Sequence, residues 1–258
     1  MRPRDLTMPN SENKTTAAVI LAAGLGKRMK SDLPKVLHQI GGRYIVDYVI
    51  DNVKAAGVTD IVLVIGHKHE LVKEKLADRG VKFALQVPQL GTGHAVQMAV
   101  PYLGDFSGDL LVLCGDMPLV STKTILDFMK MRQQTEAAAV VLTVILKNPG
   151  SYGRIVRDDG GFLKAIIEYR DADDATRQIN EVNTGAYCFD FKALVTVLNQ
   201  LNSENAQAEY YLTDTISLLK SKGLKVAALV SDDPDEGLGI NSVEELAHIS
   251  SIIKEPKK

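Results

Sequence analysis

The chain has 258 residues, of which 45% are hydrophobic and 24% charged, and its formal net charge is −2. This length allows one large α/β domain or two smaller ones around a substantial core. Without a basic excess a nucleic-acid-binding protein is disfavoured, and no apolar run approaches the roughly 20 residues of a membrane span. We therefore expect a protein that binds neither nucleic acid nor membrane.

The first 16 residues, MRPRDLTMPNSENKTT, are polar and lack the apolar segment of a signal peptide. We expect them to be a disordered or expression-derived lead, followed by a single folded domain over residues 17–258. The two cysteines, Cys114 and Cys188, are not spaced like metal ligands. This favours reduced thiols in a cytoplasmic protein.

The first half of the sequence alternates short β-branched runs with helical patterns. The predicted strands cover 17–22, 60–66, 81–86 and 109–116, and the predicted helices cover 43–57, 69–80 and 93–103. The first of these helices has a glycine, Gly57, in the place of a C-cap. Strand–helix alternation of this kind predicts a parallel sheet with helices on both faces.

Beyond about residue 145 the pattern changes. Two strands around the turn Asp-Asp-Gly-Gly are predicted within 152–169, which is a hairpin signal. Further predictions are strands over 184–190 and 225–230 and helices over 191–201, 209–223 and 241–254, the last capped by Asn241 or Ser242. The second half therefore predicts a mixed-sheet insertion in one α/β core.

The stretch LAAGLGKRMKSDLPKVLH follows the first predicted strand with two glycines and four Lys or Arg side chains. A dinucleotide fingerprint requires a third glycine where Met29 stands, and a P-loop requires a hydroxyl residue where Arg28 stands. Two interpretations remain. One is a solvated basic turn, and the other is a loop whose amides, with Lys27, Arg28 and Lys35, bind a substrate carrying several phosphates.

Two further segments follow predicted strands. Asp116 in LCGDMPLV would lie at the carboxyl end of a parallel strand, where it either holds Mg²⁺ or caps the following turn. In QVPQLGTGHA, the amide of Gln86 or Gln89 could read a nucleobase edge. The alternative for Gly91 and Thr92 is a plain loop and helix cap.

Glu168 and Asn183 carry groups suited to sugar hydroxyls, although turn and cap chemistry would also explain each of them. His67 and His69 lack a third metal ligand, and no histidine has a Ser or Cys partner at a recognisable spacing. An attacking phosphate monoester is already anionic and needs no general base. Cations, Mg²⁺ and positioned amides can therefore provide the chemistry of such a site.

Seven motifs occur in order: LAAGxGxRMxSxxPKVLH (21–38), QxxQLGTGHA (86–95), GDxPL (115–119), YGRI (152–155), IE (167–168), NEVNTG (180–185) and EYYLTD (209–214). Together they resemble the pyrophosphorylase domain of bacterial N-acetylglucosamine-1-phosphate uridylyltransferases of the GlmU type, over about residues 17–250. The resemblance implies a Rossmann-like nucleotide-diphospho-sugar transferase fold, with a mixed, mostly parallel sheet and helices on both faces. It also implies Mg²⁺-dependent transfer of UMP from UTP to N-acetylglucosamine 1-phosphate, releasing pyrophosphate, for cell-wall precursor synthesis.

The resemblance also implies a role for each matched residue. The implied site residues are Arg28 and Lys35 for catalysis at the phosphates, Ala23, Gly24, Gln86, Gly91 and Thr92 for the nucleotide, Gly153, Glu168 and Asn183 for the sugar, and Asp116 and Asn241 for Mg²⁺.

This sequence departs from the family in three respects. Lys27 stands where the family commonly has threonine, and Cys114 replaces a commonly aromatic residue. The left-handed β-helix of the bifunctional members has no counterpart up to Lys258, so the resemblance assigns neither acetyl transfer nor an oligomeric state. The alternatives are a related nucleotidyltransferase for another sugar 1-phosphate or nucleotide, and a non-catalytic nucleotide-sugar-binding relative.

Overall fold

The computed structural model describes residues 15–254. Apart from Thr15 and Thr16, the lead expected over residues 1–16 therefore lies outside the described residues. Thr16 already belongs to the first strand, β1 (Thr16–Ala22). No helix in the described part of the chain is long and apolar enough to cross a membrane.

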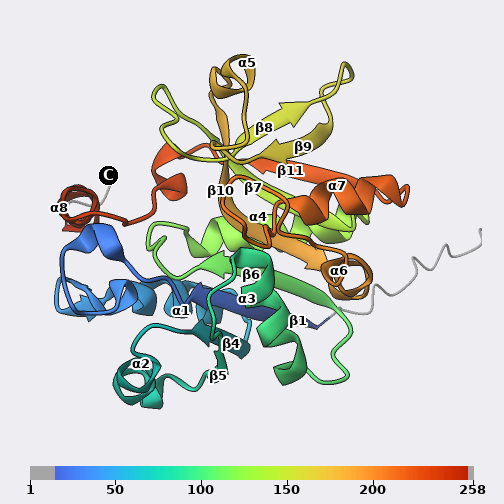
Figure 1. Cartoon of the computed structure of the whole chain (residues 1–258). Helices are drawn as coiled ribbons and strands as arrows, with labels where there is room; N and C mark the ends of the chain where they lie inside the picture. The colour runs from blue at the N-terminus through green and yellow to red at the C-terminus, as the bar shows by residue number, and fades with distance from the viewer. Residues whose placement is uncertain (1–14, 255–258) are drawn as a thin grey trace, which may run out of the picture.

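The first half forms the parallel part of the sheet, as predicted (Figure 1). Strand β1 lies between β4 and β6, parallel to both, and β5 extends the sheet beyond β4. The bounds are β4 (Asp60–Ile65), β5 (Lys82–Leu85) and β6 (Asp109–Cys114), with helices α1 (Ile45–Ala55), α2 (His69–Lys75) and α3 (Thr92–Ala99). Gly57 has a φ of 87°, which fits its predicted place at the end of α1.

The short elements between these are the 3₁₀ turns η1 (Lys27–Met29), η2 (Lys35–Leu37), η3 (Ala77–Arg79) and η4 (Val100–Tyr102) and the two-stranded β2 (Gln39–Ile40) and β3 (Arg43–Tyr44). Two longer elements, α4 (Thr122–Thr135) and β7 (Ala139–Ile145), occupy a region for which the sequence analysis made no prediction.

The second half makes the sheet mixed. Strand β10 (Glu181–Asp190) runs antiparallel to both β6 and β7 and carries the predicted hairpin of β8 (Arg154–Arg157) and β9 (Leu163–Ile167). Strand β11 (Val226–Val230) closes the edge, parallel to β7. The order is β11-β7-β10-β6-β1-β4-β5, so one antiparallel strand separates two parallel groups.

The remaining helices are α5 (Asp174–Arg177), α6 (Phe191–Leu198), α7 (Asp214–Ser221) and α8 (Val243–Lys254), with the 3₁₀ turn η5 (Pro234–Gly237) before α8. The helix predicted over 209–223 begins only at Asp214, so the prediction is wrong for its first five residues. The reason is that Tyr210 forms backbone hydrogen bonds with Leu90 and with Gly93 of α3 instead of with its own helix.

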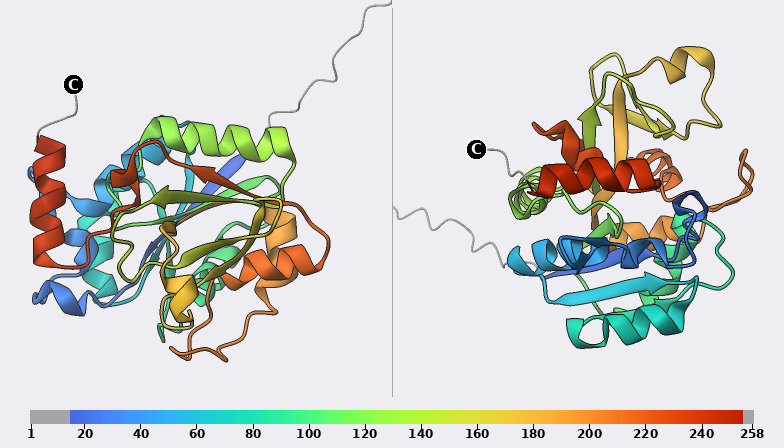
Figure 2. Two further views of the ribbon diagram at one scale, coloured as in Figure 1. Left: turned by 90° about the horizontal axis from the view of Figure 1, so that it is seen from above. Right: turned by 90° about the vertical axis from the view of Figure 1, so that its left-hand side faces the viewer.

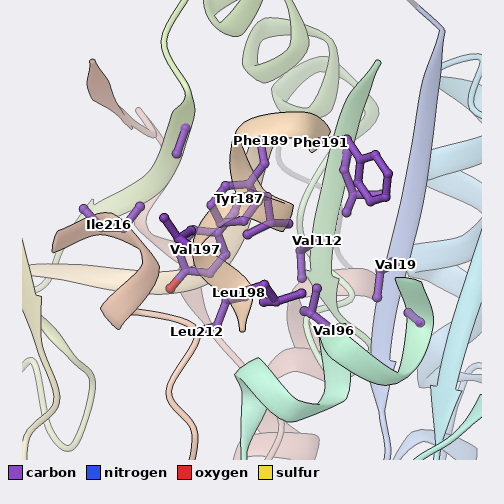
Figure 3. Close-up of a cluster of buried hydrophobic side chains, with 14 of the residues drawn as sticks. Val19, Val96, Val112, Tyr187, Phe189, Phe191, Val197, Leu198, Leu212 and Ile216 are labelled. Atoms are coloured by element: carbon purple, nitrogen blue, oxygen red, sulfur yellow. The ribbon is translucent and has the colours of Figure 1, made fainter. Parts of the chain in front are cut away.

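Helices lie on both faces of the sheet (Figure 2), and a hydrophobic core fills the space on each side. On one face Val19 and Val112 pack with Val96 of α3 and Val197 of α6, as Figure 3 shows. On the other face the alternate residues of β1 pack against α1 and α4. Helices on both faces follow from strands such as β1, β4 and β6, which are apolar at every position after the first.

A third, smaller core lies under α8, which packs beside the segment that follows β1 (Figure 1). Ile249 of α8 meets Met29, Ile40 and Ile45 there, and Ile240 joins them from the segment before the helix. Each fully buried side chain of this kind contributes about 1.5–3 kcal/mol. This core therefore holds α8 against the segment that follows β1.

Candidate active site

The glycine-rich loop is shaped by close backbone contact. Gly26 has a φ of 60°, and a Cβ at this position would lie 3.0 Å from Cβ of Lys35. Met29, which occupies the place of a third fingerprint glycine, is only 2% exposed and belongs to the core under α8. The loop is thus fixed at one end by Lys35 and at the other by a buried methionine.

Lys35 joins two other segments in a cluster of polar side chains. Its Nζ donates hydrogen bonds to Oδ2 of Asp116 and, over 3.1 Å, to Oδ1 of Asn241. Asp116 follows β6, and Asn241 precedes α8, where the N–H of Ile240 donates to the carbonyl of Asp116 over 3.0 Å. The side chains of Lys35 and Asp116 are only 16% and 15% exposed, so their attraction is only partly screened by water.

A cavity of about 440 Å³ opens between this cluster and the loop after β5; we refer to it as the first cavity. Its walls include nine of the predicted site residues: Ala23, Gly24, Arg28, Lys35, Gln86, Gly91, Thr92, Asp116 and Asn241. The structure therefore brings together the whole set that the sequence assigned to the nucleotide, the phosphates and the metal.

One wall of the first cavity is formed by two segments that the sequence analysis treated separately. Tyr210 donates its N–H to Leu90 O over 2.8 Å and accepts from Gly93 N–H over 2.7 Å. Gly91 has a φ of 108°, and a Cβ there would lie 2.7 Å from the carbonyl oxygen of Tyr210. The glycines of QLGTG thus allow the chain at 209–211 to approach, and Glu209 reaches the cavity wall as a result.

Both glutamines considered for the nucleobase lie in this wall. Gln86 donates from Nε2 to Gly91 O over 2.9 Å and has His94 Nδ1 at 3.2 Å, whereas Gln89 donates from Nε2 to Ala23 O. The structure therefore brings Gln89 to the same cavity as Gln86, although only Gln86 was carried over from the family.

A second cavity of about 280 Å³ contains the three predicted sugar residues, Gly153, Glu168 and Asn183. Five residues line both cavities: Leu21, Arg28, Thr92, Cys114 and Asn241. The two cavities are therefore parts of one cleft, and Arg28 and Asn241 lie at their junction.

Glu168 is a half-buried carboxylate in the second cavity. Burial raises its pKa above the ordinary value, although the Thr213 hydroxyl, which donates to Oε1 over 3.2 Å, acts in the opposite direction. Gly153 lies against it, since a Cβ at that glycine would be 3.5 Å from both carboxylate oxygens. A carboxylate with little water around it can accept strong hydrogen bonds from hydroxyl groups.

Asn183 is fixed by an irregularity of β10. Its Nδ2 donates to the hydroxyl of Tyr187 over 2.8 Å, and its Oδ1 accepts from Gly185 N–H over 3.0 Å. The pairing of β10 with β7 shifts register between Asn183 and Tyr187. A bulge of this kind re-aims a side chain, here into the second cavity.

The motif YGRI supplies two residues to which the sequence analysis gave no role. Arg154 is 1% exposed, and its guanidinium donates to the carbonyl oxygens of Pro149, Gly150, Tyr152 and Arg177. A buried cation paired with four carbonyls and no carboxylate organises the loop that forms one wall of the second cavity. The sequence signal for this role was the presence of an arginine in the otherwise uncharged motif YGRI.

Tyr152 links that loop to Asn241, the asparagine that the resemblance assigns to Mg²⁺. Its hydroxyl oxygen accepts a hydrogen bond from Gly239 N–H over 3.2 Å, and the Gly239 carbonyl accepts from Nδ2 of Asn241 over 3.3 Å. Burial raises the pKa of Tyr152, so the phenol stays protonated at neutral pH. The wall of the second cavity and the cluster at Lys35 are therefore connected through two hydrogen bonds.

The site offers two oxygen ligands to a divalent cation. Among the described residues no three His, Cys, Asp or Glu side chains gather as a metal site. Asp116 and Asn241 nevertheless direct oxygens at a single cationic group, the ammonium of Lys35. This donor set suits Mg²⁺, which usually takes one or two protein oxygens and completes its shell with phosphates and water.

Cys114 contributes no nucleophile to the cleft. Burial, together with the negative charge of Asp116, raises the pKa of its thiol to about 12, and Sγ lies 3.6 Å from Gly185 O. The thiolate is the reactive form, so this thiol stays inert at neutral pH. Because Cys114 lines both cavities, its small side chain defines the space at their junction.

Fold and site together define an α/β protein with a two-part cleft at the carboxyl ends of β1, β5 and β6, whose wall includes Arg28 and Lys35. The model of the MobA-like NTP transferase domain matches residues 18–159. The chain thus belongs to the MobA-like NTP transferase family, in agreement with the fold class predicted from its motifs.

Known proteins that are similar to the chain agree with this assignment. It is 48% identical to the bifunctional protein GlmU of Acetivibrio thermocellus over 92% of the chain and 51% of that protein. It is also 48% identical to the bifunctional protein GlmU of Halalkalibacterium halodurans, with 92% and 52% coverage. The chain thus spans about half the length of these relatives.

Among solved structures, the chain is similar to a Bacillus anthracis protein described as a glucose-1-phosphate thymidylyltransferase, in complex with sucrose. The TM-score is 0.75 over 95% of this chain and 97% of that one, at 18% sequence identity. At this identity the likeness shows the fold alone. It agrees with the mixed sheet predicted here.

Proposed function

We propose that this chain transfers UMP from UTP to N-acetylglucosamine 1-phosphate, forming UDP-N-acetylglucosamine and pyrophosphate. The observation that carries the proposal is the two-part cleft, in which the nine residues assigned to nucleotide, phosphates and metal line one cavity and the three assigned to the sugar line the next. The likeness to bifunctional GlmU proteins supports the same reaction.

In this proposal the sugar 1-phosphate lies in the second cavity and UTP in the first. An oxygen of the sugar phosphate attacks the α-phosphorus of UTP, a new P–O bond forms, and the bond to the pyrophosphate oxygen breaks in line with it. The attacking oxygen is already anionic, so no side chain has to remove a proton. The protein must instead align the two oxygens and offset the repulsion between two anions.

Arg28 and Lys35 carry the positive charge for this task. Arg28 lines both cavities, so its guanidinium is placed to contact the phosphate of the sugar and that of the nucleotide. The ammonium of Lys35 is held at Asp116 and Asn241, within the same cavity wall as the glycine-rich loop. Asp116 and Asn241 would hold Mg²⁺, which when bound supplies further positive charge to the phosphate oxygens.

The sugar ring would be recognised by hydrogen bonds in the second cavity. Glu168 and Asn183 offer acceptor oxygens, and the main chain at Gly153 approaches closely because it lacks a side chain. That the protein acts in the cytoplasm and contributes to cell-wall precursor synthesis remains part of the proposal.

A substrate panel tests the proposed function. Pyrophosphate release is measured with UTP, CTP, GTP and dTTP, each combined with N-acetylglucosamine 1-phosphate, glucose 1-phosphate and galactose 1-phosphate, with and without Mg²⁺. The highest kcat/KM is expected for UTP with N-acetylglucosamine 1-phosphate in the presence of Mg²⁺. A higher value for another pair supports the related nucleotidyltransferase, and binding without release supports the non-catalytic relative.

A further inference from the structure

Gln86 is the most deeply buried polar side chain of the first cavity. It is 4% exposed, and its backbone N–H is fixed by a 2.8 Å hydrogen bond to Ile65 O of the neighbouring strand. A buried amide is selective only if its carbonyl and its NH₂ group have fixed places, since the two ends differ only in whether they accept or donate.

Two acceptors hold the NH₂ end of Gln86. The carbonyl oxygen of Gly91 lies 2.9 Å from Nε2 and can only accept. Nδ1 of His94, in the first turn of α3, lies 3.2 Å from the same nitrogen. An amide nitrogen carries two protons, so both are used when the Nδ1 of His94 is unprotonated and its proton is on Nε2.

His94 is suited to remain in that neutral form. It is half-buried, burial lowers the pKa of its imidazole, and its ring lies 6.4 Å from that of Tyr210. With both protons of the Gln86 amide engaged, Oε1 is its remaining polar atom. Among the described residues no side chain or backbone group donates a hydrogen bond to that oxygen.

We propose that His94 is a specificity-determining positioning residue, which fixes the amide of Gln86 so that the first cavity presents a hydrogen-bond acceptor to the base of the nucleotide. The inference rests on the proposed function, because it needs a nucleobase in this cavity. An acceptor matches a base that carries N–H at its ring edge, as the uracil imide does. It opposes cytosine, whose N3 is itself an acceptor.

Both restraints oppose rotation of the amide. Turning it by half a turn would place Oε1 against the Gly91 carbonyl and against Nδ1 of His94, which gives two contacts between acceptors. Without the imidazole only the contact with the Gly91 carbonyl opposes the rotation. The rotated amide then becomes more accessible, and it would present NH₂ to cytosine.

The test compares His94→Leu, which removes the acceptor, with His94→Asn, whose side-chain oxygen can replace Nδ1. His248→Leu, on the exposed part of α8, is the matched control. We expect His94→Leu to lower the ratio of kcat/KM for UTP to that for CTP by about fivefold, the size of one net hydrogen bond. His94→Asn and His248→Leu should keep the ratio of the unchanged protein.

An equal fall for UTP and CTP in His94→Leu would overturn the inference, since it would mean that His94 only supports the fold. Calorimetric Kd values of UTP and CTP for the same variants separate this inference from the proposed function. Loss of the UTP preference in binding supports the role of His94 even if no pyrophosphate is released, a result that would contradict the proposed function alone.

A measurement without substitution covers the case in which His94→Leu does not fold. The ¹⁵N chemical shifts of the His94 ring in the full chain report which nitrogen carries the proton. We expect an unprotonated Nδ1 at neutral pH. A proton on Nδ1 would overturn the inference, because that atom could then not accept from Gln86.

Discussion

The two cavities of the cleft are built from different parts of the chain and in different ways. The first lies at the carboxyl ends of parallel strands, and its wall includes the small residues Ala23, Gly24 and Gly91, which leave the main chain accessible. The second lies in the antiparallel part of the sheet, and its polar groups are side chains, above all Glu168 and Asn183.

Because of this difference, amino-acid substitutions can alter ligand recognition in the second cavity more easily than in the first. Main-chain amides and carbonyls remain whatever the side chain, so the first cavity can change mainly through its glutamines and through glycines that permit close contact. The second cavity depends on individual side chains held by individual hydrogen bonds, such as the one from Thr213 to Glu168. We therefore expect the choice of sugar to be easier to alter than the choice of nucleotide.

The largest effect is expected in the cluster around Lys35, at the wall of the first cavity. Asp116→Asn removes the carboxylate that pairs with Lys35 while keeping the size of the side chain. The turnover number should fall about 10³-fold, because charge stabilisation at the phosphates is lost while neither cavity changes shape. Steady-state pyrophosphate release measures this, with the exposed Asp105→Asn as control. Activity close to that of the control would mean that the metal and phosphate site lies elsewhere.

A smaller effect is expected from Gly91→Ala, which disturbs the wall of the first cavity and leaves the second unchanged. The added Cβ would meet the Tyr210 carbonyl at 2.7 Å in a residue with φ of 108°. We expect a loss of about 2–4 kcal/mol in the free energy of unfolding and a higher KM for UTP. Gly104 also has a positive φ, of 56°, but open space around it. The loss of unfolding free energy in Gly104→Ala therefore measures the cost of the backbone conformation without a steric clash. Equal losses in the two variants would contradict the steric argument.

The second cavity is tested separately by Thr213→Val. This change removes the hydroxyl that donates to Glu168 and keeps the shape of a residue that is 3% exposed. The KM for the sugar phosphate should rise about fivefold, the equivalent of one net hydrogen bond, with the KM for UTP unchanged. Thr135→Val, which loses a partly buried hydrogen bond to Met131 O within α4, away from both cavities, should change neither. A parallel rise in both KM values would argue against separate cavities.

The smallest effect concerns the cost of burying the Glu168 charge. Because the folded state raises its pKa, the folded state binds more protons than the unfolded state between the ordinary value of 4.5 and the raised value. Stability therefore falls as the pH rises through this window. Glu168→Gln should raise Tm by about 2 °C at neutral pH and lose this gain at pH below 4.5.

Thermal unfolding at several pH values measures this effect. Glu204→Gln, at an exposed carboxylate, should leave Tm unchanged throughout. A gain in Glu168→Gln that does not depend on pH would indicate a packing effect instead of a titration.

The elements of the first half were predicted closely because strands and helices there have clear apolar periods and end at glycines such as Gly57. The segment from 209 to 213 was wrongly predicted as helical because its aromatic residues fit a helical period. Only its partner, residues 90–93 at the start of α3 and more than a hundred positions away, reveals why it is not helical. Local patterns contain no information on such pairing.

For the site, motifs identified the residues but not their contacts. The hydrogen bond between Lys35 and Asn241 spans 206 positions, and the register shift after Asn183 arises from the pairing of β10 with β7. Arg154 was missed because an isolated arginine predicts a solvated side chain, and its four carbonyl partners become apparent only when the loop is folded.

The separation of Lys35 from Asn241 has a consequence for the newly made chain. At about 5–20 residues per second, a ribosome adds the 206 intervening positions in roughly 10–40 seconds. During that time the parallel strands around β1 can form, but the partner that arrives with α8 does not yet exist. The cluster of Lys35, Asp116 and Asn241 is therefore completed in a late event, when α8 docks onto the buried methionine of the first loop.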